Sequence, residues 1–386
     1  MRARILVLTF VLPFAGLAQA ITGLNFREWY NPDAEVLVTL TAARFSSEYE
    51  VDFSIQTPAQ PRSKYTITWE RRDSYTQREG TALTQSPATN HETEKTLQGT
   101  WRFPVPATPW LLVLKVTNTE SKTSWVYFER IDPQFPTNGW VQKNQQKVIE
   151  KYLILNQAYQ AYAADASPFY VSAYYVDFPP ANPPFSPEAA PADRFMFYDS
   201  TFRVVPGQPF TLKKPGAYLF QRDTNAAEGF AYIGTRDVFP KFSSIADLAQ
   251  PLLYITTPDE FKALVAAGTD KAKFDKVILD ITNDKERAKN FMRSYFRRVE
   301  LANQYFTSYK HGWKTDRGMI YTIFGLPDEV SVNDGTETWF YKNSRTRFTF
   351  VRRGSVYDPE HYVLLRDKRF TEVWFSTIDL WRKSRF

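Results

Sequence analysis

Hydrophobic and polar positions in the first third of the chain recur in short runs that suit β-strands. All the runs are rich in β-branched or aromatic side chains, and several alternate with period two. They cover residues 36–40, 49–55, 65–69, 110–116 and 124–128. Turn-like segments separate them, at residues 58–63, Gly80, 86–90 and 118–122. Regularly spaced short strands are typical of an immunoglobulin-like β-sandwich, so we predict one such domain over residues 21–136.

A second, smaller β domain of the same type is predicted over residues 137–240. Residues 138–165, at the start of this domain, fit both a helix and a strand pattern. A helical stripe joins Val141, Val148, Tyr152, Leu155, Tyr159 and Tyr162. The flanking context is β, however, and Leu153 and Leu155 alternate, so helix and strand both remain open for residues 138–165. Strands are predicted at residues 169–175, 202–205, 210–212, 217–221 and 229–233. The prolines of residues 178–187 predict a stiff extended loop, because proline donates no backbone hydrogen bond.

The pattern changes in residues 241–386, where helical periodicity predicts an α+β domain. Thr257, Pro258 and Glu260 form a helix-start signal, and Gly268 ends that helix. A longer helix is predicted to follow residues 283–286, where Asp284 and its neighbours repeat the capping pattern. Its apolar face consists of Ala288, Phe291, Met292, Tyr295, Val299, Ala302, Tyr305 and Phe306. Basic side chains, among them Arg297 and Arg298, fall largely off that face and predict a basic outer surface.

Residues 312–328 combine a turn, an aromatic residue and a helix start. Gly312 permits a tight turn, and Trp313 is predicted to be buried with one partner for its indole N–H. Thr315 is placed to cap a short helix, and Asp316 suits the positive end of that helix. Gly325 is predicted to end the helix and Pro327 to prevent its continuation.

The remaining C-terminal residues predict a small sheet and a final helix. Residues 339–341 and 346–351 are two strands joined by a polar turn, and residues 362–365 are a possible third strand. Residues 370–381 form a terminal helix, or a strand and then a helix, that covers the sheet.

The first twenty residues have the composition of a secretory signal peptide. Arg2 and Arg4 precede an apolar run over residues 5–17, and Ala18-Gln19-Ala20 is a cleavage signal. The run is too short and too broken for a transmembrane helix. No other stretch is long and apolar enough to span a membrane, so no transmembrane segment is predicted. We therefore expect a soluble chain in the periplasm or at the periplasmic face of the outer membrane.

Composition narrows the possible chemistry. The chain has no cysteine, which excludes disulfides, thiolate zinc sites and cysteine nucleophiles. The net charge of +6 falls to +4 without the two signal arginines. Basic residues cluster at positions 71–72, 297–298, 352–353 and 366–369. These clusters are most simply solvated faces, although they also suit an acidic partner or lipopolysaccharide phosphates. Nucleic acid is not expected as a partner of an exported protein.

His311, Asp316 and Arg317 lie close in sequence and could serve acid–base chemistry together with His361. A structural interpretation is better supported: Asp316 as the helix-start charge, Arg317 paired with Glu300 or Glu337, and His311 on an exposed turn. Three histidines without cysteine argue against a metal site, and no cofactor motif is present. Carboxylate pairs for glycoside hydrolysis have no sequence motif and remain open. We therefore predict no catalytic, cofactor-binding or metal-binding residue.

The motif Gly312-Trp313-x-Thr315-Asp316 resembles the signature of the GWxTD-domain proteins of Gram-negative bacteria. The resemblance extends to Phe324-Gly325-x-Pro327-Asp328 and to Glu337-Thr338-Trp339. The residues that carry it, and that we expect to be mainly structural, are Gly312, Trp313, Thr315, Asp316, Arg317, Gly318, Gly325, Pro327 and Trp339. It implies a location in the cell envelope and a fold for the last third of the chain, but no reaction.

These patterns predict a non-catalytic adaptor or assembly scaffold that binds other cell-envelope proteins. The alternative is a periplasmic glycan-binding or glycan-processing protein that uses the sandwich surfaces. Aromatic and arginine side chains dominate interface anchors. The candidate partner surface therefore comprises Trp29, Tyr30, Arg297, Arg298 and Trp381.

Overall fold

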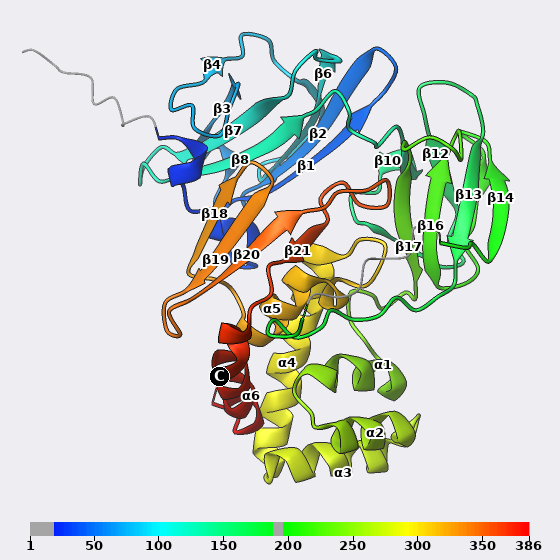
Figure 1. The fold of residues 1–386 in the computed structure, drawn as a ribbon. Helices are drawn as coiled ribbons and strands as arrows, with labels where there is room; N and C mark the ends of the chain where they lie inside the picture. The colour runs from blue at the N-terminus through cyan, green and yellow to red at the C-terminus, as the bar shows by residue number, and fades with distance from the viewer. Residues whose placement is uncertain (1–18, 188–195, 386) are drawn as a thin grey trace, which may run out of the picture.

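The computed structural model describes residues 19–187 and 196–385, which form five β-sheets and a layer of helices (Figure 1). The predicted signal peptide rests almost entirely on residues 1–18, which lie outside the described residues.

Two four-stranded antiparallel sheets face each other in the N-terminal part, with strand orders β1-β2-β6-β5 and β4-β3-β7-β8. Their bounds are β1 (Leu37–Arg44), β2 (Glu48–Gln56), β3 (Tyr65–Arg72), β4 (Thr81–Ala82), β5 (Ala88–Glu92), β6 (Thr96–Pro104), β7 (Trp110–Asn118) and β8 (Ser124–Ile131). Alternate residues of β2 and β7 fill the space between the sheets, among them Val51, Ile55, Leu112 and Leu114. The sandwich-like pairing follows from this period-two burial. The turn predicted at residues 86–90 is wrong, because β5 begins there as an exposed edge strand.

Residues 138–165, for which helix and strand were both open, form strands. Asn144, Gln145 and Asn156 have positive φ values of 52°, 65° and 63°, which a helix cannot contain. The second β part has two sheets, ordered β10-β9-β12-β15 and β11-β17-β16-β13-β14. The strands are β9 (Trp140–Lys143), β10 (Gln146–Lys147), β11 (Tyr152–Ile154), β12 (Tyr159–Tyr162), β13 (Phe169–Tyr174), β14 (Ser200–Val204), β15 (Pro209–Phe210), β16 (Gly216–Gln221) and β17 (Phe230–Thr235).

The C-terminal part is a helical layer with a four-stranded antiparallel sheet, β18-β19-β20-β21 (Figure 1). Its elements are α1 (Ile245–Ala249), α2 (Pro258–Ala267), α3 (Lys271–Thr282), α4 (Lys285–Phe306), α5 (Asp316–Phe324), β18 (Glu329–Asn333), β19 (Thr336–Tyr341), β20 (Thr346–Arg352), β21 (Tyr362–Leu364) and α6 (Thr371–Arg382). The predicted starts are confirmed: Thr257 and Glu260 form a capping box, and the Asp284 side chain caps α4. The final segment is a helix.

The N-terminal segment of residues 21–30 packs into the core of the C-terminal part. The Phe26 N–H donates to the Val330 carbonyl at 2.8 Å. Ile21, Phe26 and Tyr30 are buried in the same cluster as the side chains of α4, α5 and β19. Two ends of the sequence thus share one hydrophobic core.

The proline-rich loop of residues 178–187 crosses the C-terminal part outside any helix or strand, as its prolines predicted. The Ala181 N–H donates to the Lys314 carbonyl at 2.9 Å, and the Asp367 N–H donates to the Pro184 carbonyl at 3.0 Å. The Phe185 ring lies 5.3 Å from that of Phe375. The second β part is therefore attached directly to the region around Trp313.

Candidate functional site

The start of α5 is built by close backbone approach. A Cβ atom on Gly312 would lie 2.0 Å from the Ala302 carbonyl oxygen, and one on Gly318 would lie 1.8 Å from the Gly312 carbonyl oxygen. Only glycine fits at both positions. The Thr315 hydroxyl accepts a hydrogen bond from the Gly318 N–H at 3.0 Å, which confirms the predicted cap.

Trp313 is buried as predicted, with 1% of its surface exposed. Its ring meets Tyr254 edge to face at 5.9 Å. Its backbone N–H donates to Asn303 Oδ1 at 3.2 Å, which ties the turn to α4. The partner predicted for the indole N–H is not found: within the described part of the chain Trp313 Nε1 has no hydrogen bond. The ring is held by packing, since apolar side chains surround it.

Asp316 combines its place at the helix start with an internal ion pair. Its carboxylate accepts from Arg366 Nη2 at 2.5 Å and from the Leu364 N–H at 2.9 Å. The Asp316 and Arg366 side chains are 10% and 8% exposed. Arg366 was part of a predicted solvated cluster, so for this residue that prediction is wrong. The pair joins α5 to β21.

Arg317, Glu337, Tyr30 and Trp339 form a buried polar group, which we call the Glu337 cluster. Arg317 Nη1 lies 3.2 Å from Glu337 Oε2, so of the two predicted partners Glu337 is the one observed. Glu337 Oε1 accepts from the Tyr30 hydroxyl at 2.7 Å and from the Trp339 indole N–H. Burial and the nearby Glu337 raise the pKa of Tyr30 well above its usual value, so this hydroxyl stays protonated.

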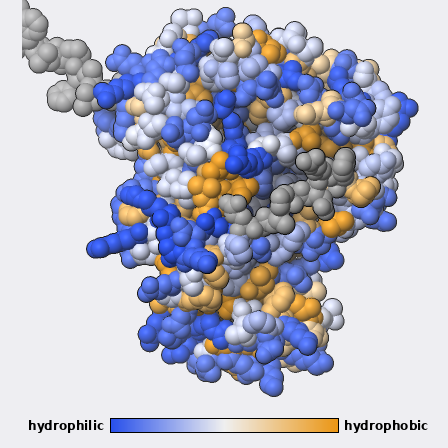
Figure 2. All heavy atoms as spheres, viewed as in Figure 1, coloured by the Kyte–Doolittle hydropathy of each residue, from blue (hydrophilic) through white to orange (hydrophobic). Residues whose placement is uncertain are grey.

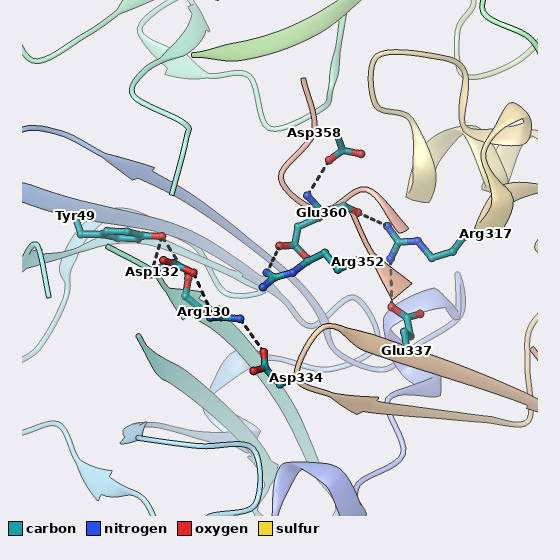
Figure 3. A network of polar contacts seen from close by, with 9 residues as sticks. All are labelled: Tyr49, Arg130, Asp132, Arg317, Asp334, Glu337, Arg352, Asp358 and Glu360. Carbon is teal, nitrogen blue, oxygen red and sulfur yellow. Dashed lines mark hydrogen bonds and ion pairs between the residues drawn. The ribbon is translucent and has the colours of Figure 1, made fainter. Parts of the chain in front are cut away.

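The Glu337 cluster continues into a longer polar network within the C-terminal part, and Figure 3 shows beside it a separate group of polar contacts that reaches the first sandwich. Arg317 donates to the Glu360 carbonyl oxygen at 3.0 Å, and the Glu360 side chain pairs with Arg352 at 3.1 Å. Nearby, Arg130 of β8 pairs with Asp334 in the β18–β19 turn at 2.7 Å. The Arg130–Asp334 pair joins the C-terminal sheet to the first sandwich.

The two C-terminal histidines do not join Asp316 and Arg317 in a reactive group. His311 is half-buried against the rings of Phe239 and Phe242, so the predicted exposed turn is wrong. Burial and Lys314 lower the pKa of His311 to about 4. Burial, Lys310 and Arg317 lower the pKa of His361 likewise to about 4. Both imidazoles are therefore neutral near pH 7. No hydrogen bond or ion pair between described residues joins His311 to Asp316 or Arg317.

Most of the predicted partner surface lies in the interior. Tyr30 and Trp381 are 7% and 0% exposed. The Trp381 indole donates to the Ile323 carbonyl at 2.9 Å, and the Arg298 guanidinium lies 4.7 Å from the centre of the Trp381 ring. Arg298 also donates to the Ile323 carbonyl oxygen at 2.9 Å, in the last turn of α5, which ends before Gly325 as predicted. These three residues therefore fill the core, and their prediction as surface residues is corrected.

The other two partner-surface candidates keep some contact with solvent. Trp29 is half-buried, and its indole N–H donates to the Val126 carbonyl at 3.2 Å. The Arg297 side chain is 53% exposed and pairs with Glu300 at 3.0 Å. Of the five candidates, Arg297 is the one whose side chain is mostly exposed.

A cavity of about 120 Å³ lies where the two β parts and the C-terminal part meet. It is lined by Glu129 of β8, by Lys147 and Lys151, and by Asp358 and Glu360 of the loop before β21. Burial and Glu360 raise the pKa of Glu129 to about 8, and burial raises that of Asp358 to about 6. Sequence pattern gave no signal for this group, because its members lie far apart in the chain.

The raised pKa of Glu129 predicts a pH-dependent stability. A carboxyl group whose pKa is higher in the folded than in the unfolded state stabilises the folded protein fully at pH values below its unfolded-state pKa. This stabilisation is lost as the pH rises through the folded-state pKa. The contribution of Glu129 to the free energy of unfolding should therefore fall between about pH 5 and pH 8, and the difference between wild type and Glu129→Gln isolates it from the contributions of other groups. After discounting for partial solvent access, we expect a fall of about 2 kcal/mol. Glu129→Gln should remove it, measured by urea unfolding at both pH values. The exposed Glu48→Gln is the control, and parallel pH profiles for wild type and Glu129→Gln would refute this assignment.

A basic groove lies between the β19–β20 turn and α6, with a volume of about 660 Å³. Arg345, Arg347 and Arg369 line it, and all three are exposed. The Arg347 guanidinium stacks 4.3 Å from the centre of the Phe340 ring. Figure 2 shows strongly hydrophilic atoms gathered over the sheet of β18, β19 and β20. We call this the α6 groove.

Among residues 19–187 and 196–385, no group of three or more His, Asp or Glu side chains has the geometry to hold a metal ion. Within the same ranges, no helix has the length and hydrophobicity needed to cross a bilayer.

Comparison with known proteins identifies the C-terminal part. No curated protein matches the chain. The family model described as the GWxTD domain matches residues 216–383, which begin with β16 and end just after α6. The match contains all the residues that built the start of α5 and the Glu337 cluster, except Tyr30. Residues 216–383 therefore form a GWxTD domain.

Proposed function

We propose that this chain is a non-catalytic adaptor of the cell envelope that binds an acidic segment of a protein partner in the α6 groove. The observation that carries the proposal is the set of three exposed arginines at this groove. Arg345 and Arg347 have no ion-pair partner among the described residues, and Arg369 has only Asp367 at 3.4 Å. Guanidinium groups bind carboxylates with two parallel hydrogen bonds, which favours an acidic ligand.

The form of the groove supports a protein ligand. Its floor includes the buried Phe370 and the half-buried Val373, while Glu372 is its one acidic side chain. An apolar floor with a basic rim suits a partner that offers an aromatic or aliphatic anchor flanked by carboxylates.

The contacts of the signature residues support a structural role for them. Asp316 and Glu337 are paired with Arg366 and Arg317, and His311 and His361 are both neutral.

We further propose that the two β parts are immunoglobulin-like modules, that the chain is exported by its signal peptide, and that it comes from a Gram-negative bacterium. The paired sheets of each β part, which are antiparallel except where β11 pairs with β17, and the N-terminal sequence support these points.

The proposal predicts that charge reversal in the groove abolishes partner binding. Mature protein carrying Arg345→Glu, Arg347→Glu and Arg369→Glu should lose at least tenfold in affinity for a partner captured by the wild type from an envelope fraction. Wild-type binding should also weaken as salt rises from 0.05 to about 0.5 M, because exposed charges are screened.

The matched control reverses three exposed charges on α4 with Lys285→Glu, Lys289→Glu and Arg293→Glu. It should bind as the wild type does. Retention of binding by the groove variant would refute the proposal, as would an equal loss in the control.

A further inference from the structure

A second hollow lies between the first sandwich and the second β part, with a volume of about 620 Å³. One wall is the outer face of the β1-β2-β6-β5 sheet, and the other is the β9–β10 hairpin. We call it the intermodule cleft. Ligand sites commonly occupy such positions between domains and have volumes of this order.

The sheet wall is polar because of the two-residue period of its strands. Val51 and Ile55 of β2 point into the sandwich core, so Glu50, Asp52 and Ser54 point into the cleft. The neighbouring strands present further polar side chains in the same way: Thr39, Thr41, Gln98, Thr100 and Arg102. A face that packed against another module as simple core would be apolar.

The hairpin wall adds amide groups. Gln142, Gln145 and Gln146 line the cleft from β9, the turn and β10. The turn is two residues long, with positive φ at Asn144 and Gln145. Each amide offers both donors and an acceptor.

Hydrogen bonds fix several of these side chains in place. Asp52 accepts from the Thr100 hydroxyl at 2.6 Å and from Lys147 Nζ at 2.8 Å. Glu50, only 6% exposed, accepts from Arg102 Nε at 3.0 Å. Side chains held before binding lose little entropy when a ligand arrives.

Four of the five Asp, Glu, Lys or Arg side chains that line the cleft cancel in pairs, and the fifth, Glu150, is exposed. Lys147 pairs with Asp52 and Arg102 pairs with Glu50. The cleft therefore differs from the α6 groove, where the arginines are mostly unpaired. Neutral amides, hydroxyls and paired charges match a ligand with many hydroxyl groups and no net charge. Tyr162, half-buried and stacked at 4.3 Å on the buried ring of Trp140, offers an aromatic surface for the C–H face of a sugar ring.

We propose that the intermodule cleft binds a neutral oligosaccharide. An extended peptide fits less well, because peptides add to the edge of a sheet, whereas this wall is a sheet face. The intermodule cleft is separate from the α6 groove. If the oligosaccharide proposal fails, the adaptor proposal is therefore unaffected.

The test is isothermal titration of the whole mature protein with neutral hexasaccharides of β-1,4-glucose, α-1,4-glucose and β-1,4-N-acetylglucosamine, after a screen on an array of neutral polysaccharides. We expect saturable binding to at least one. Thr39→Trp, at an exposed position on the cleft wall, should block it, and Gln145→Ala with Gln146→Ala should weaken it at least tenfold.

Gln56→Ala is the matched control, because Gln56 is exposed on the same strand as Glu50 but does not line the cleft. It should bind as the wild type does. No binding to any neutral glycan would overturn the proposal, as would binding that Thr39→Trp leaves intact. Preference for a peptide library over every glycan would overturn it as well.

Discussion

Glu337→Ala should lower the free energy of unfolding by about 3–5 kcal/mol, since it leaves a buried arginine without its partner. Glu337 is 2% exposed and receives hydrogen bonds from Arg317, Tyr30 and Trp339. The substitution therefore strands a cation and two further donors in the interior. Urea unfolding followed by circular dichroism measures the loss.

Thr338→Ala is the matched control, because Thr338 is the next residue on β19 and makes one partly exposed contact with Thr349. We expect its cost to stay near 1 kcal/mol or below. If both variants unfold at the same urea concentration, the Glu337 cluster does not stabilise the fold as described.

Trp313→Ala should cost about 3–5 kcal/mol, because the ring is buried and its removal leaves a cavity. Trp313→Phe should cost much less. Phenylalanine keeps most of the packing and also removes an indole N–H that has no acceptor in the described structure, a group whose burial itself costs about 1–3 kcal/mol.

Melting temperatures of the two variants distinguish packing from hydrogen bonding at this position. We expect the melting temperature of Trp313→Phe to be close to that of the wild type, and the melting temperature of Trp313→Ala to be far below both. Equal losses in the two variants would show that the indole N–H does have a partner.

Local signals predicted the elements whose ends are marked by side chains. Thr257 with Glu260, Asp284 and Thr315 each cap the helix they were expected to cap. Such caps depend on residues within one turn, so one sequence is enough to find them.

Helix α3 and strand β6 were not predicted although both have buried apolar positions, and elements without apolar periodicity of their own were missed as well. Strand β5 is exposed along its whole length and looks like a turn in sequence. The segment of residues 21–30 forms short helical turns with no repeating pattern, and its place is set by Val330 and Glu337, more than 300 residues away.

The partner-surface prediction failed for a related reason. Arg298 and Trp381 look like interface anchors in sequence, but each covers the other inside the domain. Arg298 is covered because Trp381 lies against it. Nothing in the sequence around either residue indicates that α4 and α6 pack together. The α6 groove and the intermodule cleft likewise combine residues from distant strands.

The contacts of the GWxTD motif region indicate that it organises the interior and ties the N-terminal segment to the C-terminal domain. Hydrogen–deuterium exchange of Glu337→Ala against wild type, followed on peptides from residues 20–31, tests this role most directly. We expect much faster exchange in this segment in the variant, because Tyr30 loses its acceptor and the Glu337 cluster no longer holds it. Unchanged exchange in residues 20–31 would contradict this role.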